Sequence, residues 1–180
     1  MNALGKRLIT LGASFVIAVS ATFLVAPFEG KENKAYLDLV GIPTICFGEI
    51  KGVKLGDYKT DAQCEESLAK ELTSYNKEMK KYVTVPLPEN MEVAYTSFVW
   101  NVGLGAWKNS TLLKKLNSKD YPGACQQLLR WDKAGGKTVK GLTNRRQAEY
   151  KVCMGKDADV NKALQELKKQ GYDSLDVGED

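Results

Sequence analysis

The sequence has no histidine among its 180 residues. This absence excludes Ser-His-Asp and Cys-His nucleophile systems, and every zinc site that uses histidine ligands. The four cysteines are widely spaced and include no C-x-x-C pair, so they do not indicate a Cys-only zinc site. Neither histidine nor cysteine therefore indicates a zinc site in this sequence.

The sequence also lacks a phosphate-binding glycine loop and a basic patch interleaved with aromatic residues. Nucleic acid is therefore not an expected partner. The net charge is +4, of which residues 1–28 carry +2 and residues 156–180 carry −3, which leaves +5 on the middle of the chain. This basic balance favours an anionic polymer, such as a cell wall, as the partner.

Charge is absent from residues 8–28, which read LITLGASFVIAVSATFLVAPF. As one helix this stretch would span about 30 Å, enough for the core of a bilayer. Lys6 and Arg7 precede it and predict an N-terminus that stays in the cytoplasm while the rest is exported. The stretch is weakly hydrophobic, because nine of the 19 residues from Leu8 to Ala26 are Thr, Gly, Ala or Ser. Bilayer insertion is thus favoured by only about 3–6 kcal/mol.

Three interpretations of this stretch stay open. It is a cleavable signal peptide if the small residues Val19-Ser20-Ala21 mark a cleavage site. It is a permanent membrane anchor in the second interpretation, which its weak hydrophobicity fits poorly. It is a buried core helix in the third, which the two leading basic residues disfavour.

Export would place the four cysteines in an oxidising compartment, where an even number of cysteines suggests disulfides. Four cysteines allow three pairings. We favour the pairing in which each disulfide joins neighbouring predicted elements, with the bonds Cys46–Cys64 and Cys125–Cys153.

Hydrophobic periodicity and capping signals predict a short strand region followed by a mostly helical chain. We expect a strand pair within residues 28–48, and one more short strand in 48–56, where glycines alternate with apolar residues. Helix starts are indicated by a capping box at Thr60 and by the caps Ser110 or Asn109, Asp120 and Thr143. The predicted helices cover residues 61–82, 88–103, 110–118, 120–133, 143–154 and 157–170.

Two carboxylates and a hydroxyl stand at a defined spacing in residues 28–48, which read FEGKENKAYLDLVGIPTICFG. Asp38 follows Glu29 after eight intervening residues, and Thr44 follows after five more. Such a set suits glycoside hydrolysis, in which one acid protonates the leaving oxygen and a second group handles water. Singly, each of the three would be interpreted as a boundary or turn residue.

The same spacing, inside EG…AYLD…GIPTICFG, resembles the catalytic signature of the phage-type lysozymes, glycoside hydrolase family 24. Two further blocks agree in the right order, SFVWNVGLGAWKNSTLLKKLN at 97–117 and ACQQLLRWDKAGGKTVKGLTNRR at 124–146. The resemblance covers about residues 28–155. The cysteines and the N-terminal stretch narrow it to the signal-arrest-release endolysins of lambdoid phages, of the phage 21 type.

The resemblance implies roles for the three residues of the hairpin. Glu29 would be the general acid, and Asp38 and Thr44 would position or activate the attacking water. Asn101 and Gly103 are further candidates, for substrate binding.

Three other positions near the candidate site carry expectations of their own. Arg145 and Arg146 are expected to pair with acids within the fold. Glu49 stands where many relatives have a histidine, and it would either change the electrostatics of the hairpin or be exposed and inert.

The resemblance also implies a fold and a division of the chain. The fold would be α+β and lysozyme-like, with a small three-stranded antiparallel sheet that carries an active-site cleft against a mostly helical lobe. Residues 1–28 would be a releasable signal-anchor segment and residues 29–155 the catalytic domain. Residues 156–180 have no counterpart in the family, and their own apolar periodicity and acidic end predict a surface helix and a frayed tail.

The function implied is that of an endolysin, a monomer that needs no cofactor or metal. It would cleave the β-1,4 bond between N-acetylmuramic acid and N-acetylglucosamine in peptidoglycan and so lyse the host cell. The enzyme would wait in the inner membrane, held through residues 8–28 with Glu29 away from Asp38 and Thr44, and become soluble in the periplasm on release. One alternative is a lysozyme with a conventional cleaved signal peptide. Another is a non-catalytic wall-binding or lysis-regulating protein on a lysozyme fold.

Overall fold

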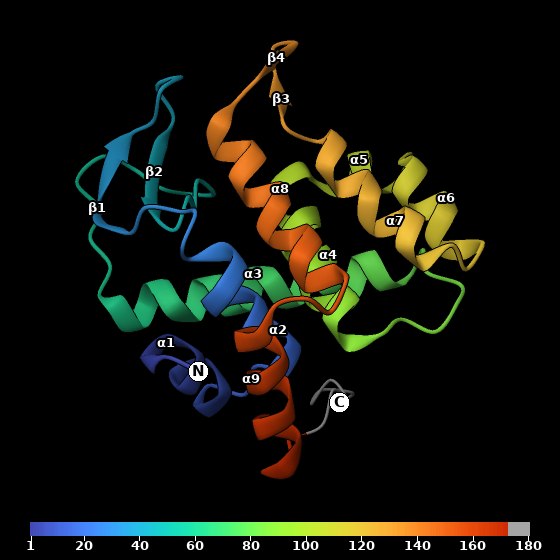
Figure 1. The fold of residues 1–180 in the computed structure, drawn as a ribbon. Coiled ribbons are helices and arrows are strands. Elements are labelled where there is room, and N and C mark those ends of the chain that lie inside the picture. The colour runs from blue at the N-terminus through green and yellow to red at the C-terminus, as the bar shows by residue number, and fades with distance from the viewer. Residues whose placement is uncertain (173–180) are drawn as a thin grey trace.

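The computed structural model describes residues 1–172 and has the predicted α+β class. A mostly helical body makes up the bulk of the molecule, and a small antiparallel strand pair stands at one end of it (Figure 1). The acidic stretch 173–180, for which the sequence predicts a frayed tail, lies outside the described residues.

The strand pair that carries two of the candidate site residues is a hairpin of β1 (Glu32–Leu37) and β2 (Pro43–Cys46). The strands are antiparallel, and Tyr36 lies opposite Thr44. The predicted hairpin in this region is therefore confirmed.

The sheet has two strands rather than the predicted three. The chain turns repeatedly in residues 48–56, where we expected the third strand, because three glycines there adopt positive φ angles that favour turns. Their φ values are 99°, 73° and 99°, at Gly48, Gly52 and Gly56. Beyond this stretch an isolated bridge between Lys34 and Tyr58 extends the sheet.

Helices form the rest of the body, and α4 lies among them in contact with α2, α3 and α8. Large buried side chains of α4 and α5 fill the centre, where the rings of Tyr95 and Trp107 lie 5.4 Å apart. The helices, in chain order, are α1 (Ala3–Thr10), α2 (Phe15–Ser20), α3 (Asp61–Lys80), α4 (Glu89–Val102), α5 (Leu104–Lys108), α6 (Thr111–Asn117), α7 (Tyr121–Gln127), α8 (Lys140–Cys153) and α9 (Ala158–Lys169).

Three of the predicted helix starts are confirmed by their capping hydrogen bonds. The capping box at the start of α3 is complete, since Thr60 and Gln63 satisfy each other's backbone amides. The Ser110 side chain accepts from the amide of Leu113 at the start of α6. Asp120 caps α7 in the same way.

The segment between α7 and α8 departs from the prediction. The helix expected over 120–133 ends at Gln127, and a short 3-10 turn follows at Leu128–Arg130. A second hairpin then forms from β3 (Lys133–Ala134) and β4 (Lys137–Thr138). Its two-residue turn is Gly135-Gly136, whose positive φ angles of 56° and 78° suit a tight hairpin.

Helix α8 begins three residues earlier than predicted. Its first residue is Lys140, and the preceding Val139 is extended. Thr143, the expected cap, lies inside the helix instead, with its hydroxyl 3.3 Å from the carboxylate of Asp132.

The uncharged stretch 8–28 does not form one continuous helix. Helices α1 and α2 are separated by a turn at Gly12, whose φ is 86°, and a π-helical turn at Ala21–Val25 continues α2. Within residues 1–172, no helix combines the length and the apolar character that crossing a membrane requires.

This N-terminal segment, residues 3–25, is part of the hydrophobic core. Arg7 on α1 also reaches across to α3, where its Nε lies 2.6 Å from the buried carboxylate of Glu65. The segment therefore packs as the buried-helix interpretation predicts. Seven of its large apolar side chains are no more than 1% exposed: Leu8, Phe15, Val16, Ile17, Val19, Leu24 and Val25.

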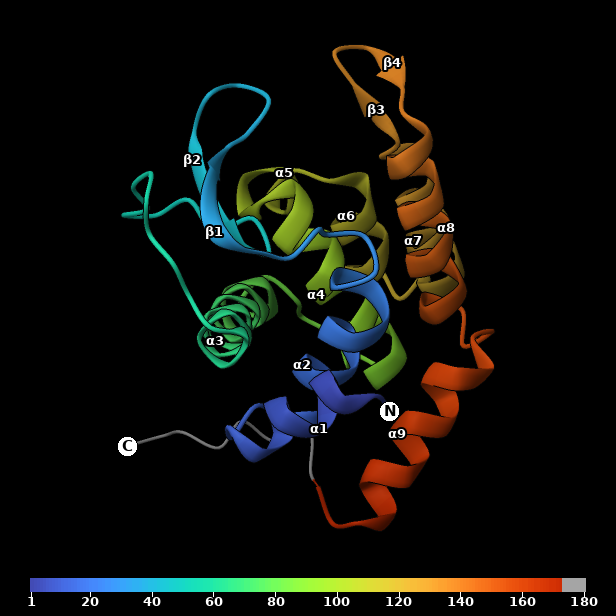
Figure 2. The ribbon, with the colours of Figure 1, turned by 90° about the vertical axis from the view of Figure 1, so that its left-hand side faces the viewer.

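Helix α9 agrees with the predicted C-terminal helix, and Asp157 caps it. It packs against α2 through four buried side chains, so it also covers the N-terminal segment. Helices α1 and α9 lie at the end of the molecule opposite the two hairpins (Figure 2). The four side chains are Val160, Ala163, Leu164 and Leu167.

Both favoured disulfides are present. Cys46–Cys64 joins β2 to α3, and Cys125–Cys153 joins α7 to α8. The first therefore ties the hairpin of the candidate site to the helical body.

Candidate active site

Glu29 stands just beyond the N-terminal segment, where the chain leaves the helical body for the β1–β2 hairpin. Its amide donates to the carbonyl of Val25, the last residue of the π-helical turn, at 3.1 Å. Gly48, which follows β2, lies beside the carboxylate, since a Cβ at Gly48 would be 4.0 Å from Glu29 Oε2. The position of Glu29 thus depends on the packing of residues 15–25.

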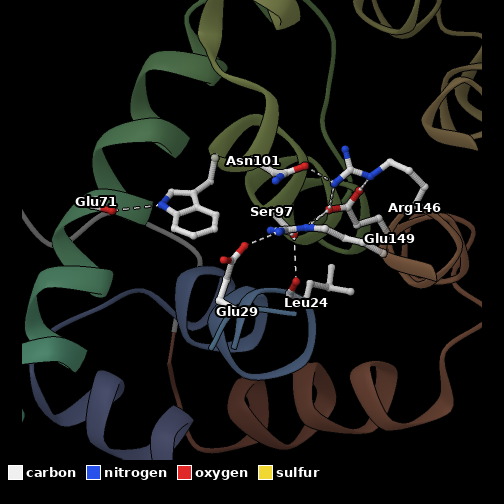
Figure 3. A network of polar contacts seen from close by, with 9 residues as sticks. Leu24, Glu29, Glu71, Ser97, Asn101, Arg146 and Glu149 are labelled. Atoms are coloured by element: carbon white, nitrogen blue, oxygen red, sulfur yellow. Dashed lines mark hydrogen bonds and ion pairs between the residues drawn. The ribbon is translucent and has the colours of Figure 1, made fainter. Parts of the chain in front are cut away.

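Arg145 on α8 holds this carboxylate. Its Nη1 lies 2.6 Å from Glu29 Oε1, and Figure 3 shows Glu29 directed toward the network around Ser97 and Glu149. The Arg145 side chain is 4% exposed and that of Glu29 is 25% exposed. The predicted pairing of Arg145 with an acid is confirmed, and the acid is the candidate catalytic residue itself.

Behind Arg145, Glu149 is fully buried and contacts two arginines. Its Oε1 lies 3.3 Å from Arg145 Nε, and its Oε2 lies 2.8 Å from Arg146 Nε. Complete burial raises the pKa of the Glu149 carboxyl, and the two arginines oppose that shift. The positive charge of Arg145 is therefore divided between two carboxylates, Glu29 in front and Glu149 behind.

A serine on α4 links this network to the N-terminal segment. The Ser97 hydroxyl donates to Glu149 Oε1 at 2.8 Å and lies 3.2 Å from the backbone carbonyl of Leu24. Arg145 Nη2 lies 3.4 Å from the same hydroxyl. Segments far apart in the sequence thus meet around one charge network (Figure 3).

Asp38 lies just after β1, at the turn of the hairpin. Its Oδ1 accepts from the amides of Val40 and Ile42, at 2.9 and 2.8 Å. One carboxylate oxygen therefore fixes the turn, and the described contacts leave Oδ2 without a partner. Because side chains alternate along a strand and Tyr36 faces Thr44, Asp38 and Thr44 lie as diagonal neighbours on one face of the hairpin.

The Thr44 side chain is nearly covered, with the residue only 4% exposed. Its hydroxyl donates to the carbonyl of Ile42 at 3.0 Å, which leaves it free to accept a hydrogen bond. Among residues 1–172, no direct hydrogen bond joins Asp38 or Thr44 to Glu29. A water molecule or substrate group between them would be needed to couple the three.

The two candidates for substrate binding have structural contacts in this arrangement. Asn101 Oδ1 accepts from Arg146 Nη2 at 2.8 Å, so Asn101 anchors the second arginine. Gly103, with φ at 86°, forms the bend between α4 and α5. A substrate-binding role for either residue stays a prediction.

Glu49 is neither exposed nor without a partner. Its carboxylate is held by the ammonium of Lys59, at 2.7 and 2.8 Å, and its side chain is 18% exposed. Glu71 of α3 is electrostatically coupled to this pair, and burial raises the pKa of the Glu71 carboxyl while a hydrogen bond from Trp100 opposes the shift. The alternative that Glu49 affects the local electrostatics is the one that the geometry favours.

Comparison with known proteins places the chain in a family. The family model for phage lysozyme matches residues 26–149. The chain belongs to the phage lysozyme family. It is accordingly a glycoside hydrolase of the lysozyme type.

Similar proteins include two named SAR-endolysin. The one from bacteriophage PS119 is 41% identical over 77% of this chain and 86% of its own length, and the one from Enterobacteria phage P21 is 40% identical over 77% and 87%. Among solved structures, the endolysin from Escherichia coli O157:H7 phage FAHEc1 is similar with a TM-score of 0.68 and 32% identity, over 75% of this chain and 90% of that one. The lysozyme-like fold is therefore confirmed.

Sequence reasoning missed part of this phage lysozyme's charge network. Glu149 had a signal, since it lies three and four residues after the two arginines, the spacing of intrahelical ion pairs. Ser97 and Trp100 had none, because their partners Leu24 and Glu71 are distant in the sequence.

Proposed function

We propose that the protein is a muramidase that hydrolyses the β-1,4 bond between N-acetylmuramic acid and N-acetylglucosamine in peptidoglycan. Glu29 acts as the general acid, and Asp38 and Thr44 position or activate the attacking water. The observation that carries this assignment is the placement of Glu29, one quarter exposed and fixed by a buried arginine, beside the hairpin that presents the other two residues. The family to which the chain belongs supports the reaction class.

The division of roles follows from the contacts of each group. As general acid, Glu29 delivers a proton to the leaving oxygen, and Arg145 fixes the carboxylate in one direction for that transfer. Because Glu149 shares the charge of Arg145, the guanidinium orients Glu29 without offering it a full unpaired positive charge. Asp38 uses one oxygen for the hairpin turn and keeps the other for water or for the cationic transition state.

Replacing Glu29 tests the catalytic assignment. Glu29→Gln keeps the shape and removes the transferable proton, so the rate of peptidoglycan hydrolysis should fall about 10²–10⁴-fold. The control is Glu32→Gln, an exposed acid on β1 of the same hairpin, which should retain full activity. Digested peptidoglycan is reduced with borohydride and analysed by mass spectrometry.

The product analysis also tests the bond. Reduced N-acetylmuramic acid ends are expected from the wild type, whereas reduced N-acetylglucosamine ends would contradict the assigned bond. Unchanged activity of Glu29→Gln would remove Glu29 from the mechanism.

We also propose that the enzyme is first held inactive in the host inner membrane by its N-terminal segment, and becomes active in the periplasm once that segment is released. Support comes from residues 8–28, which are suited both to a bilayer and to the protein core. Residues 8–28 are uncharged and long enough to span a bilayer, and the same residues pack in the core beneath Glu29. In the membrane they would keep Glu29 away from Arg145, Asp38 and Thr44. The SAR-endolysin names of two relatives agree with this proposal.

Approximate energies favour such a release. Burying each of the seven large apolar side chains of the segment contributes about 1.5–3 kcal/mol, or roughly 10–21 kcal/mol in total as an upper estimate. Bilayer insertion contributes only about 3–6 kcal/mol. The docked state is therefore the more stable one, and further contacts such as Arg7 with Glu65 add to it.

The membrane potential supplies the restraint. Lys6 and Arg7 precede the segment and must cross the bilayer before it can dock. Each positive charge that moves outward against the potential costs about 2.3 kcal/mol per 100 mV. At a potential of about 100 mV, moving the charges of Lys6 and Arg7 therefore opposes release by about 5 kcal/mol. Loss of the potential removes that cost, and the host is then lysed. We propose that the released enzyme acts as a monomer.

A further inference from the structure

Trp100, on α4, lies between the charge network of the candidate acid and helix α3. The centroid of its ring is 5.5 Å from the guanidinium carbon of Arg145. The ring of Phe28, the residue before Glu29, lies 5.9 Å from the same carbon. Two aromatic rings therefore border the guanidinium that holds Glu29, at distances where an aromatic ring attracts a cation.

The orientation of the Trp100 ring is itself fixed. Its indole N–H donates to Glu71 Oε2 on α3 at 3.2 Å, the contact drawn beside Glu71 in Figure 3. The ring is half-buried. The carboxylate of Glu71 at one edge of the indole thus limits the rotation of the ring. The guanidinium of Arg145 lies close enough to the ring for a cation–π interaction.

We propose that Trp100 is a positioning residue for hydrolysis, which keeps the guanidinium of Arg145 in the place from which it orients Glu29, and that Glu71 fixes Trp100 in turn. This inference rests on the proposed function, because it requires that Glu29 be the acid. The order of action is Glu71 to Trp100, Trp100 to Arg145, and Arg145 to Glu29. None of the first three residues needs to touch the sugar.

The charges around Arg145 indicate why an aromatic ring beside its guanidinium would matter. Glu149 pulls the guanidinium inward from α8, Glu29 pulls it outward, and Ser97 contacts it from α4. Ion pairs alone leave the guanidinium free to shift along the line between the two carboxylates. An aromatic ring beside that line restricts the shift by packing, which does not depend on the protonation of either carboxylate.

Steady-state kinetics on Trp100→Leu test the proposal. We expect kcat to fall roughly ten- to a hundredfold, the range associated with a small misplacement of a catalytic group, while KM stays within about twofold.

Two conservative variants distinguish positioning from general destabilisation. Trp100→Phe keeps a ring beside Arg145 and should restore most of kcat. Glu71→Leu removes the acceptor of the indole N–H and should lower kcat a few-fold, with Glu66→Leu, an exposed acid of the same helix, as its control. Trp131→Leu is the control for losing a half-buried tryptophan, because that ring packs on Phe98 at 5.4 Å and not on Arg145. It should lower stability and leave kcat unchanged.

Several outcomes would overturn the proposal. A rise in KM with unchanged kcat in Trp100→Leu would make Trp100 a surface for the sugar instead. A lower melting temperature with unchanged kcat would make it structural alone. If Trp100→Leu does not fold, unchanged kcat in Glu71→Leu is the contradicting result. The Glu29→Gln variant distinguishes failure of the proposed function from failure of this inference. An active Glu29→Gln variant rejects the proposed function. An inactive Glu29→Gln variant together with a fully active Trp100→Leu variant rejects only the role of Trp100.

Discussion

Single residues of the candidate site compensate one another's charge. Glu29, Arg145, Glu149 and Arg146 alternate in sign along one network, so two carboxylates and two guanidiniums meet with no net charge. Removing one partner of such a buried set leaves another charge unpaired, which is strongly destabilising. Variants of Arg145 would therefore mix catalytic and structural effects, and residues at the edge of the network are better probes.

Glu71 is such a probe, and its ionisation should be visible in the pH dependence of stability. Burial raises its pKa above the usual 4.5, so the folded state binds the Glu71 proton more tightly than the unfolded state does. Its contribution to stability is therefore fully present below about pH 4.5, the unfolded value, and is lost as the pH rises through the folded pKa. Relative to Glu71→Gln, the wild type should lose free energy of unfolding between pH 4 and pH 7.

Urea unfolding of both proteins at several pH values measures this difference. Glu66→Gln serves as the control, because the hydrogen bond and ion pair with Lys70 lower the pKa of Glu66. Its contribution to stability is present above about pH 4.5 and is lost as the pH falls below that value, so it should add no slope between pH 5 and pH 7. A wild-type curve parallel to that of Glu71→Gln would show that Glu71 keeps its ordinary pKa.

At the scale of elements, the sequence was sufficient where a local signal decides the structure. The capping box at Thr60 and the cap at Asp120 each satisfy backbone amides within one turn, and both helices start where predicted. The spacing of Glu29, Asp38 and Thr44 likewise identified the hairpin and the family.

Where tertiary packing or a special turn decides, the sequence misled. Alternating apolar residues in 48–56 suggested a strand, but three glycines with positive φ turn the chain instead. The helix predicted over 120–133 ends at Gln127 instead, and Gly135-Gly136 forms the turn of a second hairpin. The break at Gly12, whose φ is 86°, and the π-helical turn after α2 were also not predicted.

The N-terminal segment can be biased toward the membrane without disturbing the folded enzyme. Thr10 is exposed, and Ala13 borders an open surface pocket of about 390 Å³, so leucine fits at both positions. Each added leucine favours insertion by about 0.3–0.6 kcal/mol, and the loss of Thr10 adds to this. Thr10→Leu/Ala13→Leu should therefore slow release a few-fold and delay lysis.

Membrane fractionation over time follows the release. Thr10→Ser/Ala13→Ser is the matched control, with the opposite change in hydrophobicity, and should be released earlier than the wild type. Equal release of all three proteins would contradict a role for segment hydrophobicity.

For the whole molecule, the N-terminal segment connects the fold to the proposed regulation. Its apolar side chains belong to the two clusters of buried residues that form the core of the molecule. The segment ends shortly before Glu29, and α9 packs against it. Cleavage at Val19-Ser20-Ala21 would remove α1 and α2 and leave Glu29 without its support. A conventional signal peptide, one of the interpretations of the sequence, is hard to reconcile with so many buried contacts.

The intact mass of the soluble, active protein from the periplasm tests this account most directly. Release without cleavage predicts the mass of the complete chain, 19.9 kDa, in the fraction that hydrolyses peptidoglycan. A lighter active species that begins at Thr22 would contradict the account, because the residues said to support Glu29 would then be absent from the working enzyme.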